Sequence, residues 1–158
     1  EKKEKEKGKE KKTIALIEVK NVVCSDFFSK HAPQKKDNNH SIIISEEEEE
    51  TKYQRTALFP WGKLGQEWKG KKVVSARAIK HVHNLSSISR TSPHVQPIVL
   101  FVVNRGDCER VRGCDEQCAV FGGALREAKK RGVMVIAFRV RWEREGKAYF
   151  DGVLPVSC

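Results

Sequence analysis

The stretch that decides the fold is LIEVKN, residues 16–21, in which charged and apolar residues alternate. Successive side chains of a β-strand point to opposite faces, so residues two apart share a face. We therefore expect Glu18 and Lys20 to lie side by side, while Ile17 and Val19 point the other way into a core. A carboxylate binds a hard divalent cation through oxygen, and a neighbouring ammonium group can orient a water or offset charge on a phosphate. The alternative is an edge strand whose charged pair is simply solvated.

Charge is unevenly distributed along the 158 residues, whose total is +10. Residues 1–12 contribute +3 and the glutamate run 46–50 contributes −5, so the rest of the chain carries +12. A folded part this basic favours a polyanionic partner such as DNA, although a basic surface can also serve solubility alone. The length suits one domain with a hydrophobic core.

Two segments have a composition that is unsuited to a core. Residues 1–12 alternate lysine and glutamate without an apolar residue, so we interpret them as a solvated low-complexity segment. Residues 25–53 lose periodicity and contain the glutamate run, which predicts a long, mostly disordered acidic loop. A short strand at 42–44 is possible within it. The predicted α/β domain therefore covers residues 13–158.

The remaining pattern predicts an α/β fold with a mixed β-sheet flanked by helices. The expected elements are a strand at 13–23, a helix at 73–88, a strand at 97–103, a helix at 115–131, a strand at 133–140 and a hairpin partner at 148–156. The first helix has a polar stripe at helical spacing beside its apolar one. The polar stripe consists of Arg77, Lys80, His81 and Asn84.

Cysteine usage and hydropathy bear on location. The five cysteines are an odd number, and the chain has neither a secretory signal pattern nor an apolar run of about 20 residues for crossing a membrane. We expect an intracellular protein with reduced thiols, in the cytoplasm or an organelle, since a transit peptide could have preceded residue 1.

Cys108, Cys114 and Cys118 suggest zinc, but a fourth ligand is not obvious. Trp61 and Trp68 could stack on unpaired bases or be partly buried.

Four stretches, in order along the chain, resemble the C-terminal domain of the sugar fermentation stimulation protein family. They are 17–22 (IEVKNV), 58–60 (LFP), 75–81 (SARAIKH) and 124–128 (ALREA) with 131–133 and 154–156. Trp61 stands where the family has an aspartate, and Ala78 replaces a glycine. The resemblance runs from about residue 14 to residue 158, with the acidic loop as an insertion.

This resemblance implies a restriction-endonuclease-like fold of the PD-(D/E)xK type and DNA as the partner. It also implies a Mg²⁺ ion held by an upstream aspartate, the carboxylate of Glu18 and the backbone carbonyl of Val19, with Glu18 and Lys20 as catalytic residues. No aspartate precedes Glu18 here, and the family's N-terminal OB-like domain is absent from this chain. Half of the metal site would then be missing.

The resemblance further implies that Arg77, Lys80 and His81 contact nucleic acid, through phosphate oxygens or, for the histidine, by proton transfer. A satisfied structural histidine is the alternative for His81. No phosphate-binding glycine loop or serine nucleophile elbow occurs, so no small-molecule cofactor is expected. Three functions remain: a DNA-binding protein, an active Mg²⁺-dependent DNA nuclease, or an inactive regulatory or structural homologue, which Trp61 and Ala78 favour.

Overall fold

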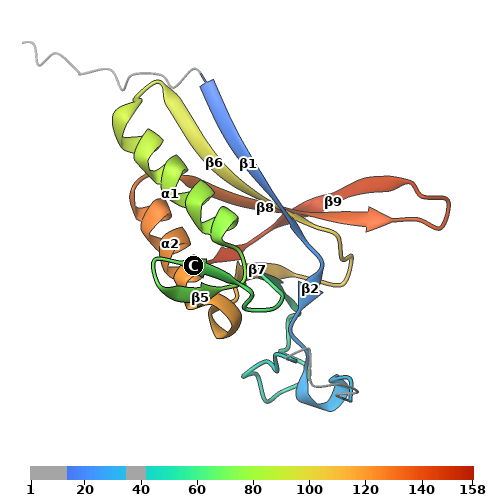
Figure 1. Cartoon of the computed structure of the whole chain (residues 1–158). Helices are drawn as coiled ribbons and strands as arrows, with labels where there is room; N and C mark the ends of the chain where they lie inside the picture. Colours follow the sequence, from blue (N-terminus) through green and yellow to red (C-terminus); the bar gives the residue numbers. More distant parts are fainter. Residues whose placement is uncertain (1–13, 35–41) are drawn as a thin grey trace, which may run out of the picture.

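A mixed four-stranded sheet with two helices on one face forms the centre of the molecule (Figure 1). The structure is a computed structural model that describes residues 14–34 and 42–158. The strand order is β1-β6-β8-β9, in which the first three strands are parallel and β9 is antiparallel. The elements are β1 (Ile14–Val22), β6 (Val95–Val103), β8 (Met134–Trp142), β9 (Ala148–Leu154), α1 (Ala76–Thr91) and α2 (Asp115–Lys130). The predicted α/β class with a mixed sheet is confirmed.

Short strands that the sequence analysis did not identify form a second sheet and a hairpin. The second sheet has the order β10 (Val156–Ser157), β7 (Arg110–Gly113), β3 (Thr56–Phe59) and β2 (Cys24–Ser25). The hairpin consists of β4 (Gln66–Trp68) and β5 (Lys71–Val73). Each of these strands has two to four residues, which is too short for an alternating pattern to stand out.

The hydrophobic core lies between the central sheet and the two helices. Phe101 of β6 and Phe121 of α2 are fully buried. Phe59, at the end of β3, packs against both, with ring centroids 5.7 Å from Phe101 and 5.1 Å from Phe121. Aromatic contacts of this kind stabilise a core beyond the area they bury. The cluster joins the two sheets and α2 into one body.

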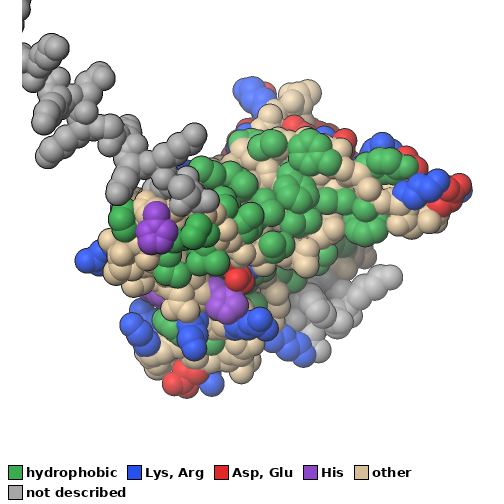
Figure 2. Space-filling view, turned by 90° about the horizontal axis from the view of Figure 1, so that it is seen from above, with side chains coloured by type: hydrophobic (Ala, Val, Ile, Leu, Met, Phe, Trp, Pro, Cys, Tyr) green, Lys and Arg blue, Asp and Glu red, His purple; other side chains and the backbone are tan. Residues whose placement is uncertain are grey.

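The orientation of β1 is the reverse of our expectation. Lys20 and Val22 face α1 and are buried, whereas Ile17 and Val19 are each 50% exposed. The reason is that helices cover only one face of the sheet, and this is the face that carries Glu18 and Lys20. The opposite face exposes apolar side chains from several strands, which form a broad hydrophobic band in Figure 2.

Helix α1 begins three residues later than predicted. Ser75 is its N-cap, because its side-chain oxygen accepts the backbone N–H of Ala78 at 3.1 Å. Val73, which we expected to begin the helix, is instead the buried last residue of β5. Helix α2 matches its predicted bounds closely and has a non-helical residue, Cys118, in its first turns.

The described parts of the segment 25–53 have more contacts than the predicted disordered loop implies. Phe28 is buried, and the backbone of Phe27 pairs with Ile43 and Ser45 through N···O distances of 3.0 and 2.9 Å. The buried carboxylate of Asp26 accepts hydrogen bonds from the Thr56 N–H and from the Tyr53 hydroxyl. These contacts involve isolated residues rather than a periodic run. Residues 1–13 and 35–41 lie outside the described residues, so the domain boundaries stay predictions.

Candidate functional site

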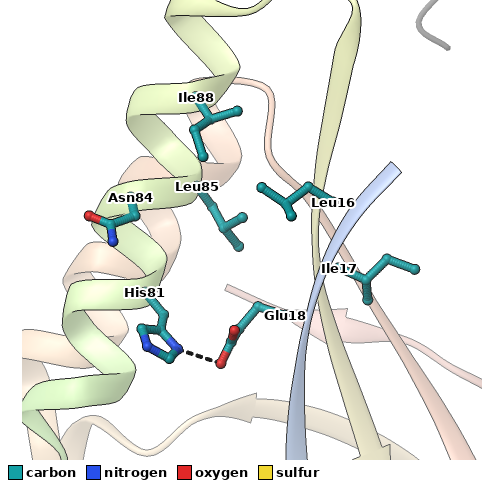
Figure 3. A pocket seen from close by; sticks show the side chains of 7 residues that line it. All are labelled: Leu16, Ile17, Glu18, His81, Asn84, Leu85 and Ile88. Carbon is teal, nitrogen blue, oxygen red and sulfur yellow. Dashed lines mark hydrogen bonds and ion pairs between the residues drawn. The ribbon is translucent and has the colours of Figure 1, made fainter. Parts of the chain in front are cut away.

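Strand β1 and helix α1 bring three of the predicted site residues together. The Lys20 ammonium donates to Oε1 of Glu18 at 2.8 Å, and Nδ1 of His81 lies 2.6 Å from the same oxygen. Figure 3 shows the imidazole and the carboxylate facing each other across the space between the helix and the strand. The arrangement follows from two periodicities, because Glu18 and Lys20 share one face of the strand and His81 lies on the helix face beside it.

Hydrogen bonding leaves two atoms of this cluster available to a ligand. An ionised carboxylate only accepts, so the contact places a proton on Nδ1 of His81 and leaves Nε2 for another partner. The second carboxylate oxygen of Glu18, Oε2, makes no hydrogen bond to any of the residues that the structure describes. One oxygen therefore fixes the cluster, while the other is open.

The environment of the cluster keeps Glu18 charged. Partial burial raises the pKa of the Glu18 carboxyl group, but the hydrogen bonds and charges of Lys20 and His81 together outweigh it and hold the pKa below its usual value. Lys20 is only 8% exposed, and the side chain of Glu18 is 28% exposed. Removing the Glu18 carboxylate would leave the Lys20 ammonium buried without an ion partner. An unpaired buried charge of this kind destabilises a fold.

An apolar groove of about 210 Å³ extends from the cluster along β1 and α1 (Figure 3). Leu16 of β1 and Leu85 and Ile88 of α1 line it, and Asn84 adds a polar group. β1 pairs with β6 on one side only, so among residues 14–34 and 42–158 its other edge is unpaired. The cluster thus lies at an open sheet edge, where an extended chain could pair with β1.

The described residues do not by themselves make a complete metal site. No group of three or more His, Cys, Asp or Glu side chains among them could hold a metal ion. Mg²⁺ requires several hard ligands before it gives up its waters. Asp26, the first aspartate of the chain, is buried against Thr56 and does not join Glu18. The predicted ligand role of the Val19 carbonyl stays a prediction, as does that of Glu18.

Arg77 and Lys80 project from the N-terminal half of α1 into solvent. Neither forms an ion pair in the described part of the chain, and the first turn of α1 contains no acidic residue. The N-terminus of a helix carries a partial positive charge, which disfavours cations there. Arg77 lies in this first turn, so the helix dipole does not stabilise it.

The cysteines do not support the zinc alternative. All five are free, and Cys108, Cys114 and Cys118 are buried. Burial is the main cause that raises the pKa of Cys108 and of Cys114 to about 11 each. Among the described residues, these thiols do not form part of any group of three or more His, Cys, Asp or Glu side chains that could hold a metal ion.

Two features of the site region could not be found by periodicity. The bond between Glu18 and His81 joins residues 63 positions apart. The β4–β5 hairpin lies against α1, because the Trp68 ring stacks on His83 with centroids 5.6 Å apart and an interplanar angle of 8°. This hairpin is defined by a two-residue turn with Gly70 at its second position, and no longer repeat marks it in the sequence.

A mixed sheet with a Glu-x-Lys strand against a helix is the architecture of the restriction-endonuclease-like proteins. Residues 72–146 match the family described as SfsA, the sugar fermentation stimulation protein RE domain. Over these residues the chain is similar to the sugar fermentation stimulation protein family, as the order of its sequence motifs predicted. Arg77, Lys80 and His81 fall within the matched residues, whereas Glu18 and Lys20 lie before them.

Curated relatives that match this chain carry the same family description. A sugar fermentation stimulation protein homolog from Thermosynechococcus vestitus is 33% identical over 73 residues, which is 46% of this chain and 30% of that protein. The homolog from Pseudomonas putida is 37% identical over 83 residues, which is 52% of this chain and 34% of that protein. The chain therefore matches about a third of the length of these relatives.

The solved structure of Pyrococcus furiosus SfsA in complex with Ca²⁺ has the same fold. Its TM-score is 0.61 at 15% sequence identity, and the alignment covers 91% of this chain and 45% of that chain. At this identity the likeness supports the fold alone. Among the described residues, no helix has the length and apolar character needed to span a membrane.

Proposed function

We propose that this chain is a DNA-binding protein whose restriction-endonuclease-like domain binds the phosphate backbone beside β1 and α1. The observation that carries the proposal is the cluster of Glu18, Lys20 and His81, flanked by the unpaired cations Arg77 and Lys80. The charge of +12 outside the two low-complexity runs adds a general attraction for a polyanion.

Each side chain has a role that suits its chemistry. The Arg77 guanidinium can bind a phosphate through two hydrogen bonds, while Lys80 acts as a point charge. Nε2 of His81 faces no partner in the part of the chain that the structure describes and can contact a phosphate oxygen. None of these contacts reads a base edge, so the binding is expected to be nearly independent of DNA sequence.

Salt titration tests this proposal. We expect the affinity of residues 1–158 for duplex DNA to fall about 10² to 10³-fold between 50 and 200 mM salt, as for a protein that neutralises about five phosphates. The double variant Arg77→Ala/Lys80→Ala should reduce the slope of log K against log salt by about two. Fluorescence anisotropy with a labelled duplex measures both quantities.

A matched control removes one arginine and one lysine at a distance from the site. Arg144→Ala/Lys147→Ala changes the same net charge on the exposed β8–β9 connection. It should leave the salt slope nearly unchanged. An affinity that is indifferent to salt, or an equal effect of the two double variants, would contradict the proposed binding mode.

A second function is a Mg²⁺-dependent DNA nuclease, supported by the open Oε2 of Glu18 beside the Lys20 ammonium. When bound, such an ion polarises a phosphate and lowers the pKa of an attacking water. The solved relative in complex with Ca²⁺ holds a hard cation of the class that carboxylates bind. In this chain the activity requires a further ligand from outside the described residues. A third function, an inactive regulatory or structural homologue, is favoured by Trp61 and Ala78 and would not bind DNA.

A further inference from the structure

We infer that the β4–β5 hairpin is a second DNA-contacting element, which guides the phosphate backbone across α1 to the site on β1. Its lysines Lys69, Lys71 and Lys72 would contact the backbone, together with Arg77 and Lys80. The inference rests on the proposed function and adds to it, because none of these three lysines belongs to the site described above.

The hairpin has a fixed shape. Gln66 pairs with Val73 and Trp68 with Lys71, so the connecting turn has only two residues. Both have positive φ, 47° for Lys69 and 78° for Gly70, which is the pattern of a type I′ turn. Such a turn matches the twist of the two strands and holds Lys69 at the tip.

Two contacts attach the hairpin to α1. The Trp68 ring stacks on the imidazole of His83, and the side-chain oxygen of Gln66 accepts the backbone N–H of Ala76 at 2.9 Å. The second contact satisfies one of the N–H groups that a helix leaves unpaired at its N-terminus. The hairpin is thus held against the same half of α1 that carries Arg77 and Lys80.

Helical periodicity places the two cations of α1 between the hairpin and the site. Successive residues are rotated by about 100°, so residues three or four apart are neighbours on the helix surface. His83 contacts the hairpin. Lys80 lies three residues before His83, and Arg77 lies three residues before Lys80. His81, four residues after Arg77, then reaches Glu18. Around the helix surface, Lys80 therefore lies next to the hairpin, and Arg77 lies between Lys80 and the site.

The charge of this band is strongly one-sided. Residues 63–83 contain six cations and one acidic residue, Glu67. The cations are all exposed, and none forms an ion pair within the described residues: Lys63, Lys69, Lys71, Lys72, Arg77 and Lys80. By contrast, Arg126 of α2 is paired with Asp115, and Arg131, the C-cap of α2, is paired with Glu127. Glu67 lies opposite Lys72 in the hairpin and offsets one charge at most.

The ligand that fits this band is a DNA backbone rather than unpaired bases. One face of the Trp68 ring is stacked on His83, and the Lys69 ammonium lies 5.9 Å from the ring centroid. The stacking of Trp68 on an unpaired base, which we considered from the sequence, would displace these contacts. A helix is about 10 Å wide and a DNA strand carries a phosphate about every 3.4 Å, so the band spans roughly three phosphates.

The test compares two pairs of adjacent, exposed lysines in the 158-residue chain. Lys71→Gln/Lys72→Gln should lower the affinity for duplex DNA about tenfold at 50 mM salt and reduce the salt slope by about two. Lys129→Gln/Lys130→Gln, at the end of α2, makes the same charge change and should alter neither. Two duplexes of unrelated sequence should give the same result. Anisotropy measures the binding, and circular dichroism checks that each variant folds.

A measurement on the unmodified chain covers the case in which a variant misfolds. Acetylation of lysines with and without bound duplex, followed by mass spectrometry, should show protection of Lys69, Lys71 and Lys72 and no protection of Lys129 or Lys130. Equal effects of the two lysine pairs, or equal protection, would overturn the inference while leaving DNA binding in place. If the unmodified chain does not bind duplex DNA at all, the proposed function itself fails.

Discussion

A longer chain that includes an upstream strand with an aspartate is expected to cleave DNA when Mg²⁺ is added, whereas residues 1–158 alone are expected to be inactive. The reason is the number of hard ligands. Glu18 offers one free carboxylate oxygen, since Oε1 is held by Lys20 and His81. The outer edge of β1 is unpaired among the described residues, so a further strand can bind there and place a second carboxylate beside Glu18.

Variants of the longer chain separate the roles of the site residues. Glu18→Ala should abolish the metal-dependent cleavage while DNA binding stays the same or tightens slightly, because a negative charge is lost. Lys20→Ala should lower the rate about 10² to 10³-fold, which is the scale for one preorganised electrostatic group. Arg77→Ala and Lys80→Ala should weaken binding and rate together, as phosphate contacts do.

The assay is cleavage of labelled duplex with Mg²⁺, Mn²⁺ or a chelator. Arg144→Ala is the control, since this exposed cation lies on the β8–β9 connection. Cleavage by residues 1–158 that survives Glu18→Ala would place the active site elsewhere. A longer chain that binds DNA but never cleaves it would instead favour a DNA-binding protein without nuclease activity.

The long elements of this fold could be predicted from sequence because their patterns are long enough to repeat. The apolar run of β6, the helical spacing in α1 and α2, and the pairing of β8 with β9 were all predicted. The second sheet was missed, since strands such as β3 and β7 contain four residues each. Leu58 and Phe59 of β3 were recognised only as part of the LFP motif at 58–60.

The covered face of β1 could not be predicted from its own sequence. Both faces of the strand carry apolar residues, for example Val22 on one and Val19 on the other. Which face is buried depends on where α1 packs, and this is a tertiary effect that outweighs the local pattern. We chose the apolar pair as the core side, whereas the helices cover the side with Glu18 and Lys20.

The candidate site was predictable in its parts but not in its connections. Glu18 and Lys20 were found by strand periodicity, and His81 by its place in the polar stripe of α1. Their meeting at a single oxygen depends on the packing of α1 against β1, which no spacing in the sequence reports. The hairpin that carries Lys71 and Lys72 was missed because one short turn, rather than a repeat, defines it.

Replacing Glu18 by alanine is also expected to destabilise the 158-residue chain, by about 2 kcal/mol at pH 7. The variant leaves the Lys20 ammonium buried without its ion partner, a situation that costs about 3–5 kcal/mol at fully buried sites and less here, since the Glu18 side chain is 28% exposed. Glu67→Ala, on the exposed strand β4, is the matched control and should change the free energy of unfolding by less than about 0.5 kcal/mol.

The double variant Glu18→Ala/Lys20→Met identifies the cause. Methionine removes the buried charge and keeps the approximate volume, so stability should return to within about 0.5 kcal/mol of the original or exceed it. Urea unfolding at pH 7 measures the cycle. A double variant as unstable as Glu18→Ala alone would show that the loss arises from other contacts of Glu18, such as His81.

The pH dependence of the Glu18→Ala effect has a defined sign. The pKa of Glu18 is lowered in the folded chain, so its ion pair stabilises the fold above the carboxyl group's usual pKa, and this stabilisation is lost as the pH falls through the lowered value. The difference between the original chain and Glu18→Ala should therefore shrink in acid. If the single variant Lys20→Met also has a higher free energy of unfolding at pH 7, the Lys20 ammonium destabilises the fold. Its presence would then be explained by a ligand that the ammonium binds.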